Sequence, residues 1–359
     1  MGEAQRSHPA DPRGRALSVA DAVAALRAGR AVTLEGGPSI LALETGTQAM
    51  LDLLDPDGEA LLMISGQRAE ALKLANRKDA ADPDRPVRIA RADWLSREAA
   101  MALADAGQDL NRAPIGPLDP LGHEAGDGSA MVLTRLAGLL PAVWVLPSAP
   151  DGALTISARD IDEALGAVEL ATRARMPLDD LPPSQIAVFR DFSNGEEHVA
   201  LIVGAFGGKP PLARLHSECL TGDVFGSLKC DCGPQLKEAL AILGKEGGGI
   251  LLCMRQEGRG IGLANKIRAY ALQDRGLDTV DANRRLGFAD DARDYRVAAG
   301  MLKALKVDAV RLLTNNPNKV AGLEAAGIAV VERVAHHLPT NPHNADYIAT
   351  KKSRSGHLD

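Results

Sequence analysis

The second half of the chain alternates between short apolar runs and longer amphipathic segments. Residues 249–254, 309–314 and 328–334 resemble buried strands, and the segments between them carry apolar residues at helical spacing. Strands separated by single helices predict a layered α/β fold in which at least part of the sheet is parallel. We expect the helices at residues 236–247, 263–274, 294–306 and 318–327.

The length of 359 residues suits two domains, each with its own core. Residues 1–15 are polar and rich in Pro and Arg, and we expect a disordered tail. Residues 19–34 predict an amphipathic helix ending near Gly29, followed by a strand. Three prolines within residues 176–185 predict a domain boundary. We therefore expect an α/β domain at residues 16–180, a second at 185–340 with a mixed sheet and helices (α+β elements), and a flexible C-terminal tail at 341–359.

The composition excludes some partners. Aromatic residues make up only 3% of the chain and the formal net charge is −6, which argues against a nucleic-acid-binding protein. The N-terminus lacks the apolar segment of a signal peptide, and no apolar run is long enough to cross a membrane. We expect a soluble, cytoplasmic protein without a membrane partner.

Three of the four cysteines lie in the stretch SECLTGDVFGSLKCDC, residues 217–232. Cys219, Cys230 and Cys232 can give three thiolates to one Zn²⁺. A structural zinc site is closed by four protein ligands, whereas a catalytic site keeps one position for water. His216 is close enough in sequence to be a fourth ligand, so the spacing leaves both kinds of site open. Cys253 lies in an apolar run and is expected in the core.

Two predicted strand-to-helix junctions are candidates for binding phosphate. Residues 255–270, RQEGRGIGLANKIRAY, contain three glycines that let backbone amides approach an anion. Residues 311–319, RLLTNNPNK, end in Lys319 and place Pro317 in a first helical turn. If both strands are parallel, both junctions can face one pocket. The alternatives are turns without a ligand and, for the acidic residues 287–295, an ordinary helix start.

Together these stretches resemble GTP cyclohydrolase II. The resemblance runs from residue 185 to the C-terminus, and it rests on four motifs in order: RLHSECLTGDVFGSLKCDCGPQL, RQEGRGIGLANKIRAYALQDRGLDTVDAN, GFADDARDY and RLLTNNPNK. The family converts GTP to 2,5-diamino-6-ribosylamino-4(3H)-pyrimidinone 5′-phosphate, formate and pyrophosphate in riboflavin biosynthesis. The resemblance implies one Zn²⁺ per subunit on the three cysteines, zinc-bound water that attacks guanine C8, Mg²⁺ on the triphosphate, and a homodimer.

The resemblance also implies roles for single residues. Tyr270 matches the tyrosine that assists ring opening, Asp291 the proton acceptor, and Arg293 the nucleophile toward the α-phosphorus. Because a guanidinium is a poor nucleophile, an electrostatic clamp is the alternative role for Arg293. Arg259 and Lys319 suit the triphosphate, and Glu257 suits the guanine edge. The implied contacts to GTP come from Arg214, Leu215, His216, Ser217, Glu218, Gln235, Glu257, Gly258, Arg259, Thr279, Thr314 and Lys319.

The first domain resembles 3,4-dihydroxy-2-butanone 4-phosphate synthase more distantly, in residues 19–34 and in the segment around His123. That synthase uses a dense acidic loop after its first strand to bind Mg²⁺. This chain has EGGPSILALETG there, with only Glu35 and Glu44 as carboxylates. Since a hard cation needs two or three placed carboxylates, we expect that this domain has lost the synthase activity.

Two other functions remain open from the sequence. The protein could be a related cyclohydrolase that stops at a ring-opened intermediate, or a non-catalytic zinc protein that senses a guanine nucleotide. The sensor would bind GTP and release no formate.

Overall fold

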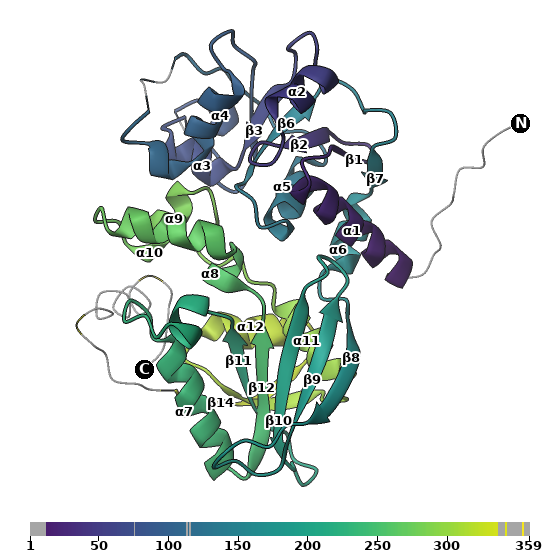
Figure 1. The fold of residues 1–359 in the computed structure, drawn as a ribbon, viewed down its shortest axis with the longest axis vertical. Coiled ribbons are helices and arrows are strands. Elements are labelled where there is room, and N and C mark those ends of the chain that lie inside the picture. Colours follow the sequence, from purple (N-terminus) through teal and green to yellow (C-terminus); the bar gives the residue numbers. More distant parts are fainter. Residues whose placement is uncertain are drawn as a thin grey trace, which may run out of the picture. The chain divides into compact units, whose positions relative to one another are not determined.

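The computed structural model describes residues 12–74, 76–112, 114, 116–336, 342 and 354 (Figure 1). The chain forms two compact units. Unit 1 holds residues up to 167 together with 192–195, and unit 2 holds 168–191 and the residues from 196 onward. The first helix begins at Pro12, so the predicted disordered tail at residues 1–15 is too long at its C-terminal end. Most of the predicted tail at 341–359 lies outside the described residues.

Unit 1 is built on one mixed sheet with the strand order β5-β4-β3-β6-β2-β1-β7. Only β1 and β7 are parallel among its described pairings. The strands are β1 (Val32–Leu34), β2 (Ser39–Ala42), β3 (Leu61–Ile64), β4 (Val87–Ile89), β5 (Pro120–Leu121), β6 (Ala142–Leu146) and β7 (Leu154–Ile156). The helices are α1 (Pro12–Arg27), α2 (Gln48–Leu54), α3 (Gly66–Ala71), α4 (Arg97–Ala104), α5 (Asp127–Leu136) and α6 (Ala158–Ala164).

Alternate residues of the unit 1 strands pack into two separate cores. In β6, Val143 and Val145 contact the core that α1, α5 and α6 cover, whereas Trp144 contacts the core of α2, α3 and α4. Both faces of the sheet are therefore buried, which explains the continuous apolar strand sequences.

Unit 2 also has one mixed sheet, with the order β14-β13-β11-β12-β10-β9-β8. Its strands are β8 (Val168–Arg175), β9 (Ser184–Asp191), β10 (Glu197–Gly204), β11 (Leu212–Ser217), β12 (Gly248–Met254), β13 (Ala309–Leu313) and β14 (Ala329–Val334). Its helices are α7 (Cys232–Lys245), α8 (Glu257–Gly260), α9 (Leu263–Gln273), α10 (Thr279–Arg285), α11 (Tyr295–Ala304) and α12 (Pro317–Ala325), with a π-helical turn, η3 (Leu220–Val224). The predicted strands and helices of this half, and its partly parallel sheet, are confirmed.

Two layers of helices cover the unit 2 sheet. Leu215, Leu252 and Leu312 pack with α11 and α12 in one core, and Leu251 and Leu313 pack with α7 in the other. Because side chains alternate along a strand, neighbours of Leu215 in β11 point to the α7 face. The polar side chains of β11 described below therefore share a face with α7.

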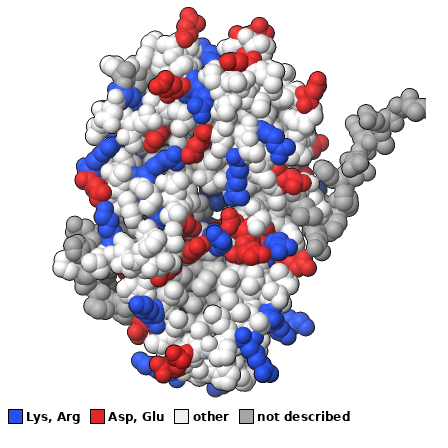
Figure 2. All heavy atoms as spheres, in the orientation of Figure 1, with Lys and Arg blue, Asp and Glu red and all other residues white. Residues whose placement is uncertain are grey.

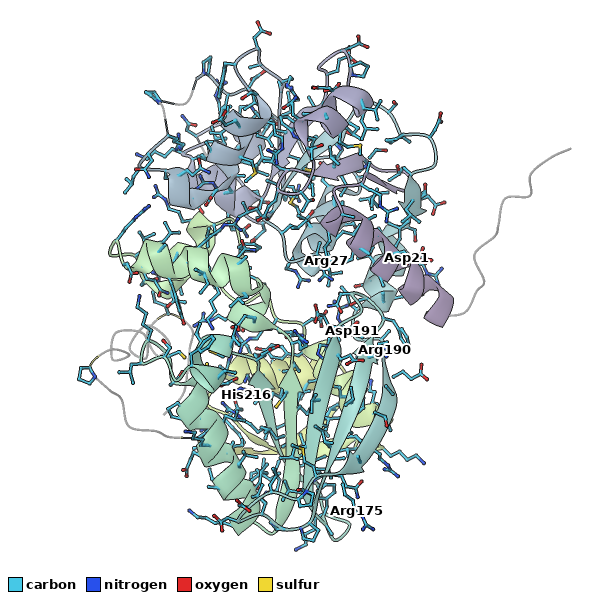
Figure 3. The ribbon with its side chains drawn as sticks, viewed as in Figure 1. Asp21, Arg27, Arg175, Arg190, Asp191 and His216 are labelled. Carbon is cyan, nitrogen blue, oxygen red and sulfur yellow. The ribbon has the colours of Figure 1, made fainter. Side chains whose placement is uncertain are left out.

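The proline-containing segment predicted to separate the domains lies inside unit 2. It connects β8 to β9, which are antiparallel neighbours in the same sheet. Figure 3 shows Arg175 at one end of this hairpin and Arg190 at the other. The contacts divide the chain at Ala167 and Val168 instead, because β8 completes the second sheet.

The described helices include none that is long and apolar enough to cross a membrane. On the face shown in Figure 2, Lys and Arg side chains are mixed with Asp and Glu.

Candidate active site

The carboxyl ends of four parallel strands lie at one edge of the unit 2 sheet. β11 pairs in parallel with β12 and with β13, and β13 pairs in parallel with β14. The cysteine-containing loop follows β11, the glycine-rich loop follows β12, and the Asn-Pro turn follows β13. Ligands of open α/β sheets bind at this edge. The sequence segments singled out for chemistry are therefore neighbours in space.

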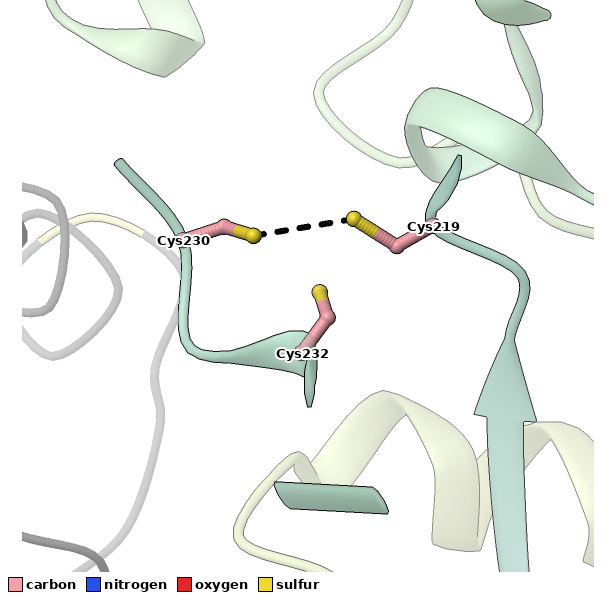
Figure 4. A group of neighbouring side chains, drawn as sticks. All are labelled: Cys219, Cys230 and Cys232. Atoms are coloured by element: carbon pink, nitrogen blue, oxygen red, sulfur yellow. Dashed lines mark hydrogen bonds between the residues drawn. The ribbon is translucent and has the colours of Figure 1, made fainter. Parts of the chain in front are cut away.

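The three clustered cysteines turn their sulfur atoms toward one another (Figure 4). The sulfur atoms all lie within 4.8 Å of one another, and those of Cys219 and Cys230 are 3.6 Å apart. None of the three forms a disulfide, since that bond would need a sulfur separation of about 2 Å. Zinc bound tetrahedrally at about 2.3 Å holds its sulfur ligands about 3.8 Å apart. The donor set and its spacing therefore fit a zinc ion.

Gly222 provides the space for this approach. A Cβ atom at Gly222 would lie 2.5 Å from the Cys230 sulfur and 3.0 Å from the Cys219 sulfur. Its backbone N–H also donates to the Cys219 sulfur at 3.3 Å. Any larger residue at this position would displace the sulfur atoms.

His216 lies on β11 (Figure 3) but is not part of the cysteine group. Its Nε2 is 2.8 Å from Asp223 Oδ2, and the same carboxylate oxygen accepts from the Cys219 N–H at 3.0 Å. His216 thus supports the cysteine loop through Asp223. This arrangement favours a three-thiolate site over the alternative in which His216 completes a closed site.

Lys266 reaches the cysteine group from α9. Its Nζ is 3.0 Å from the Cys219 sulfur and 2.7 Å from Glu257 Oε1. Burial lowers the pKa of Lys266, but the hydrogen bonds to Glu257 and Cys219 outweigh it and raise that pKa above the ordinary value. Hydrogen bonds from Cys230 and Cys232, together with the one from Lys266, lower the pKa of Cys219. Cys219 is therefore held as a thiolate, the form that binds metals.

Tyr270 lies one helical turn beyond Lys266. Its hydroxyl is 3.3 Å from Thr221 Oγ1, which in turn is 3.6 Å from the Cys219 sulfur. Burial raises the pKa of the Tyr270 phenol, so this group is protonated at neutral pH and can donate a proton. The structure brings Tyr270 beside the cysteine group.

The glycine-rich loop turns through left-handed backbone conformations, with φ between 62° and 89° at residues 258–260. Arg259 is strained there, because residues with a Cβ rarely adopt this region. Its carbonyl accepts from the Ala292 N–H at 3.0 Å, and its guanidinium donates to the Asp290 carbonyl at 3.1 Å. These bonds fasten the loop to the acidic segment that carries the remaining predicted catalytic residues.

Asp291 and Arg293 form a bidentate ion pair. Arg293 Nε and NH2 lie 2.8 and 2.6 Å from the two Asp291 carboxylate oxygens, and the Tyr295 hydroxyl donates to the same carboxylate at 3.1 Å. Burial alone would raise the pKa of Asp291, but the hydrogen bonds and charge of Arg293 lower it below the ordinary value. The pair is therefore charged on both sides at neutral pH.

The site also contains two buried cations, Arg214 and Lys319. Arg214 donates to Gln235 Oε1 at 2.6 Å, and Gln235 donates to Asp231, between two of the cysteines, also at 2.6 Å. Burial lowers the pKa of Arg214 to about 10, so the guanidinium remains charged at neutral pH. Lys319 is equally buried and donates to the Leu215 carbonyl at 2.6 Å. Arg214 lies within β11, and Lys319 lies in the first turn of α12, which follows β13.

The remaining residues predicted to contact GTP also lie in unit 2. The Leu215 side chain is fully buried, so only its backbone could meet a ligand. Thr314 directly follows β13, and its hydroxyl accepts from the Asn316 N–H at 3.0 Å. Thr279 begins α10 and accepts from Gln273 on α9 at 3.1 Å. Ser217 and Glu218 precede the cysteine loop directly. All twelve GTP contacts stay predictions.

Sequence reasoning missed four residues that the structure places here: Lys266, Gly222, Asp223 and Tyr295. A signal existed for Lys266, because residues four apart on a helix share a face and Tyr270 was already a candidate. For Gly222 no signal existed, since its role depends on how closely the loop folds back on the cysteines.

We expect Gly222→Ala to weaken zinc binding by about 10- to 100-fold or more, because the added methyl displaces two ligand atoms. Metal content and chelator competition on the purified protein measure this. Gly128→Ala is the control, since a Cβ there meets nothing within 4 Å. Wild-type zinc content in Gly222→Ala would contradict the arrangement.

We expect Asp291→Asn to lower the free energy of unfolding near neutral pH by about 1–3 kcal/mol, because a charged hydrogen bond is weakened. Since the folded pKa of Asp291 is lowered, its contribution is present above the unfolded value of about 3.9 and is lost as pH falls through the folded value. Urea unfolding between neutral pH and pH 3 should show the two proteins converging in acid. A difference independent of pH would exclude the ion pair as its source.

Comparison with known proteins agrees with these features. The family model described as GTP cyclohydrolase II matches residues 169–335. The GTP cyclohydrolase-2 of Azospirillum brasilense is 42% identical over 94% of this chain and 92% of its own length. The GTP cyclohydrolase-2 of Escherichia fergusonii is 60% identical over 47% of this chain and 86% of its own length. The riboflavin biosynthesis protein RibBA of Cytophaga hutchinsonii is 35% identical over 95% of this chain and 97% of its own.

The first and third of these relatives align across both units, and the second aligns with about half of the chain. The matched region includes the cysteine group, the glycine-rich loop and the Asp291–Arg293 pair. With similarity of this extent to a relative over nearly its whole length, the chain belongs to the GTP cyclohydrolase II family.

Proposed function

We propose that this protein is a GTP cyclohydrolase II, which hydrolyses GTP to 2,5-diamino-6-ribosylamino-4(3H)-pyrimidinone 5′-phosphate, formate and pyrophosphate in riboflavin biosynthesis. The observation that carries the proposal is the three-cysteine group with Tyr270 beside it. Ring opening requires an activated water and a proton donor within reach of each other, and this group supplies the residues for both.

The ring-opening step depends on groups held by the cysteine loop. Cys219, Cys230 and Cys232 would hold a zinc ion, which would supply the Lewis acidity that activates water for attack at guanine C8. Tyr270, kept protonated by burial and held by Thr221, donates a proton to the nitrogen that separates from C8. Both the loop and α9 are packed elements, so the donor is preorganised.

The release of pyrophosphate depends on cations at the same edge. We assign Arg293 an electrostatic role: it stabilises the charge that develops as pyrophosphate leaves. The bidentate contact with Asp291 supports this role, because an ion pair favours the protonated guanidinium, which is no nucleophile. Arg259 and Lys319 would bind the triphosphate, with Mg²⁺ neutralising part of its charge. Mg²⁺ and a homodimer are predictions that the resemblance alone supports.

We also propose that unit 1 has no 3,4-dihydroxy-2-butanone 4-phosphate synthase activity. The turn between β1 and β2 packs directly on the start of α5: a Cβ at Gly37 would lie 3.1 Å from the Ala125 carbonyl oxygen. Of the two carboxylates after the first strand, Glu44 accepts from the Leu140 N–H at 2.8 Å. Within the described residues, the cysteines are the one group of three or more side chains suited to a metal.

We expect zinc-loaded protein with Mg²⁺ to release formate and pyrophosphate from GTP at equal rates. Cys230→Ser should lose formate release by at least about 100-fold, because one metal ligand is removed. Coupled assays for the two products measure both rates. Pyrophosphate without formate would place the failure at ring opening, and release of unchanged GTP would favour the sensor function instead. Formate without pyrophosphate would indicate an enzyme that stops at a ring-opened intermediate.

For unit 1 we expect no 3,4-dihydroxy-2-butanone 4-phosphate when the protein is incubated with the synthase's sugar-phosphate substrate and Mg²⁺ in the absence of GTP. The reason is the missing set of carboxylates. Product detection by mass spectrometry, with Cys230→Ser protein in parallel, is the measurement. Product formation that survives Cys230→Ser would show that unit 1 is active.

A further inference from the structure

Lys266 links the cysteine loop to the glycine-rich loop. Its ammonium lies 3.0 Å from the Cys219 sulfur and 2.7 Å from Glu257 Oε1, and only 8% of the residue is exposed. The other oxygen of Glu257 accepts from the Leu220 N–H at 2.8 Å. Because Leu220 follows Cys219 directly, the four residues form a closed ring of contacts.

The carboxylate of Glu257 is committed to this ring. Besides Lys266 and Leu220, the N–H of Gly258 donates to Oε1 at 3.0 Å. A carboxylate with three donors already in place has little remaining capacity to read a base. In the structure Glu257 holds the cysteine loop through the Leu220 N–H, whereas the sequence resemblance suggested that it contacts guanine.

The aliphatic part of the Lys266 side chain is held as firmly as its ammonium group. A Cβ at Gly258 would lie 3.0 Å from the Lys266 Cβ, so the loop backbone rests on this side chain. The Lys266 N–H donates to the Gly262 carbonyl at 3.0 Å. The ammonium is therefore held at the sulfur atom without the freedom of a surface lysine, and little side-chain entropy remains to be lost.

Charge explains why such a group is needed. Three thiolates and a divalent cation leave one net negative charge in a site where Cys219 and Cys230 are buried. Buried charge without a partner is costly. An N–H donor on a thiolate also withdraws electron density from the sulfur, so the ligand donates less to the metal and the metal remains a stronger Lewis acid.

We infer that Lys266 is a positioning residue of the metal centre: its ammonium compensates the thiolate of Cys219 and, through Glu257, fixes the loop that carries this ligand. This inference rests on the proposed function for the presence of the metal. It assigns Lys266 no contact with GTP.

The test uses cobalt(II) as the probe in full-length protein, because cobalt takes tetrahedral zinc sites and reports its thiolate ligands through charge-transfer bands. Lys266→Met removes the charge while keeping most of the stem, and Lys266→Arg keeps the charge. Lys237→Met is the matched control, since Lys237 is exposed on α7. Glu257→Gln keeps an acceptor for Leu220 and removes the carboxylate charge.

In Lys266→Met we expect the thiolate-to-cobalt band to move to lower energy and metal affinity to fall by about 10- to 100-fold. Lys266→Arg should restore part of both, and Lys237→Met should match wild type. Glu257→Gln should have a smaller effect that is not additive with Lys266→Met, because both act through one ammonium. Wild-type band position and affinity in Lys266→Met would overturn the inference.

A purely structural role for Lys266 would give a different result. It would lower the urea midpoint of the metal-free protein and leave the cobalt spectrum unchanged, which also overturns the inference. All of these measurements are made without GTP. A normal thiolate–cobalt spectrum in wild type, changed by Lys266→Met, would therefore support the inference even if GTP were not hydrolysed. Wild-type protein without a thiolate–cobalt band would overturn it.

Discussion

The close approach of three sulfur atoms around Gly222 is the constraint on which the rest of the site depends. Two of the cysteines flank the start of α7 and the third follows β11, so the sheet and helix must meet at a fixed distance. A Cβ at Gly233 would lie only 2.4 Å from the Gly222 carbonyl oxygen, so glycine at both positions allows η3 to pack on α7. A π-helical turn at this point suits a loop shaped by function rather than by regular pairing.

Negative charge at this point is balanced by several fixed groups. Cys232 is the first residue of α7, where the helix dipole favours an anion. Lys266 contacts Cys219 directly, and Arg214 is linked to Asp231 through Gln235. These cations are buried and carry hydrogen bonds, so their positions are set before any substrate binds. Preorganised charge of this kind acts in a low-dielectric site without reorganisation during the reaction.

Sequence patterns predicted the second unit well because its strands are covered on both faces. A strand such as β12 is then continuously apolar, and each helix lies between two strands, so boundaries are easy to locate. The domain boundary predicted at residues 176–185 is not where the contacts divide the chain, because prolines occur in turns as well as in linkers. The turn from β8 to β9 resembles a linker until the strand pairing is known. In the site, ligand spacing was local and visible. The contacts among Cys219, Leu220, Glu257 and Lys266 join residues that lie 9, 37 and 47 positions apart, beyond the reach of a local pattern.

The geometry of Arg293 bears on how one site can catalyse two different cleavages. Attack by a guanidinium would require loss of its proton, yet Asp291 holds it in a charged pair with two short contacts. Tyr295 donates to the same carboxylate and packs against Gly322, where a Cβ would lie 2.4 Å from the tyrosine ring. The helix that begins at Tyr295, α11, thus holds the Asp291–Arg293 pair in place. In the proposed function, a guanidinium fixed in this way stabilises the leaving pyrophosphate, whereas the chemistry at C8 is assigned to the cysteine loop and Tyr270. The proposed roles are separated because the cysteine loop follows β11, whereas the Asp291–Arg293 pair lies between β12 and β13.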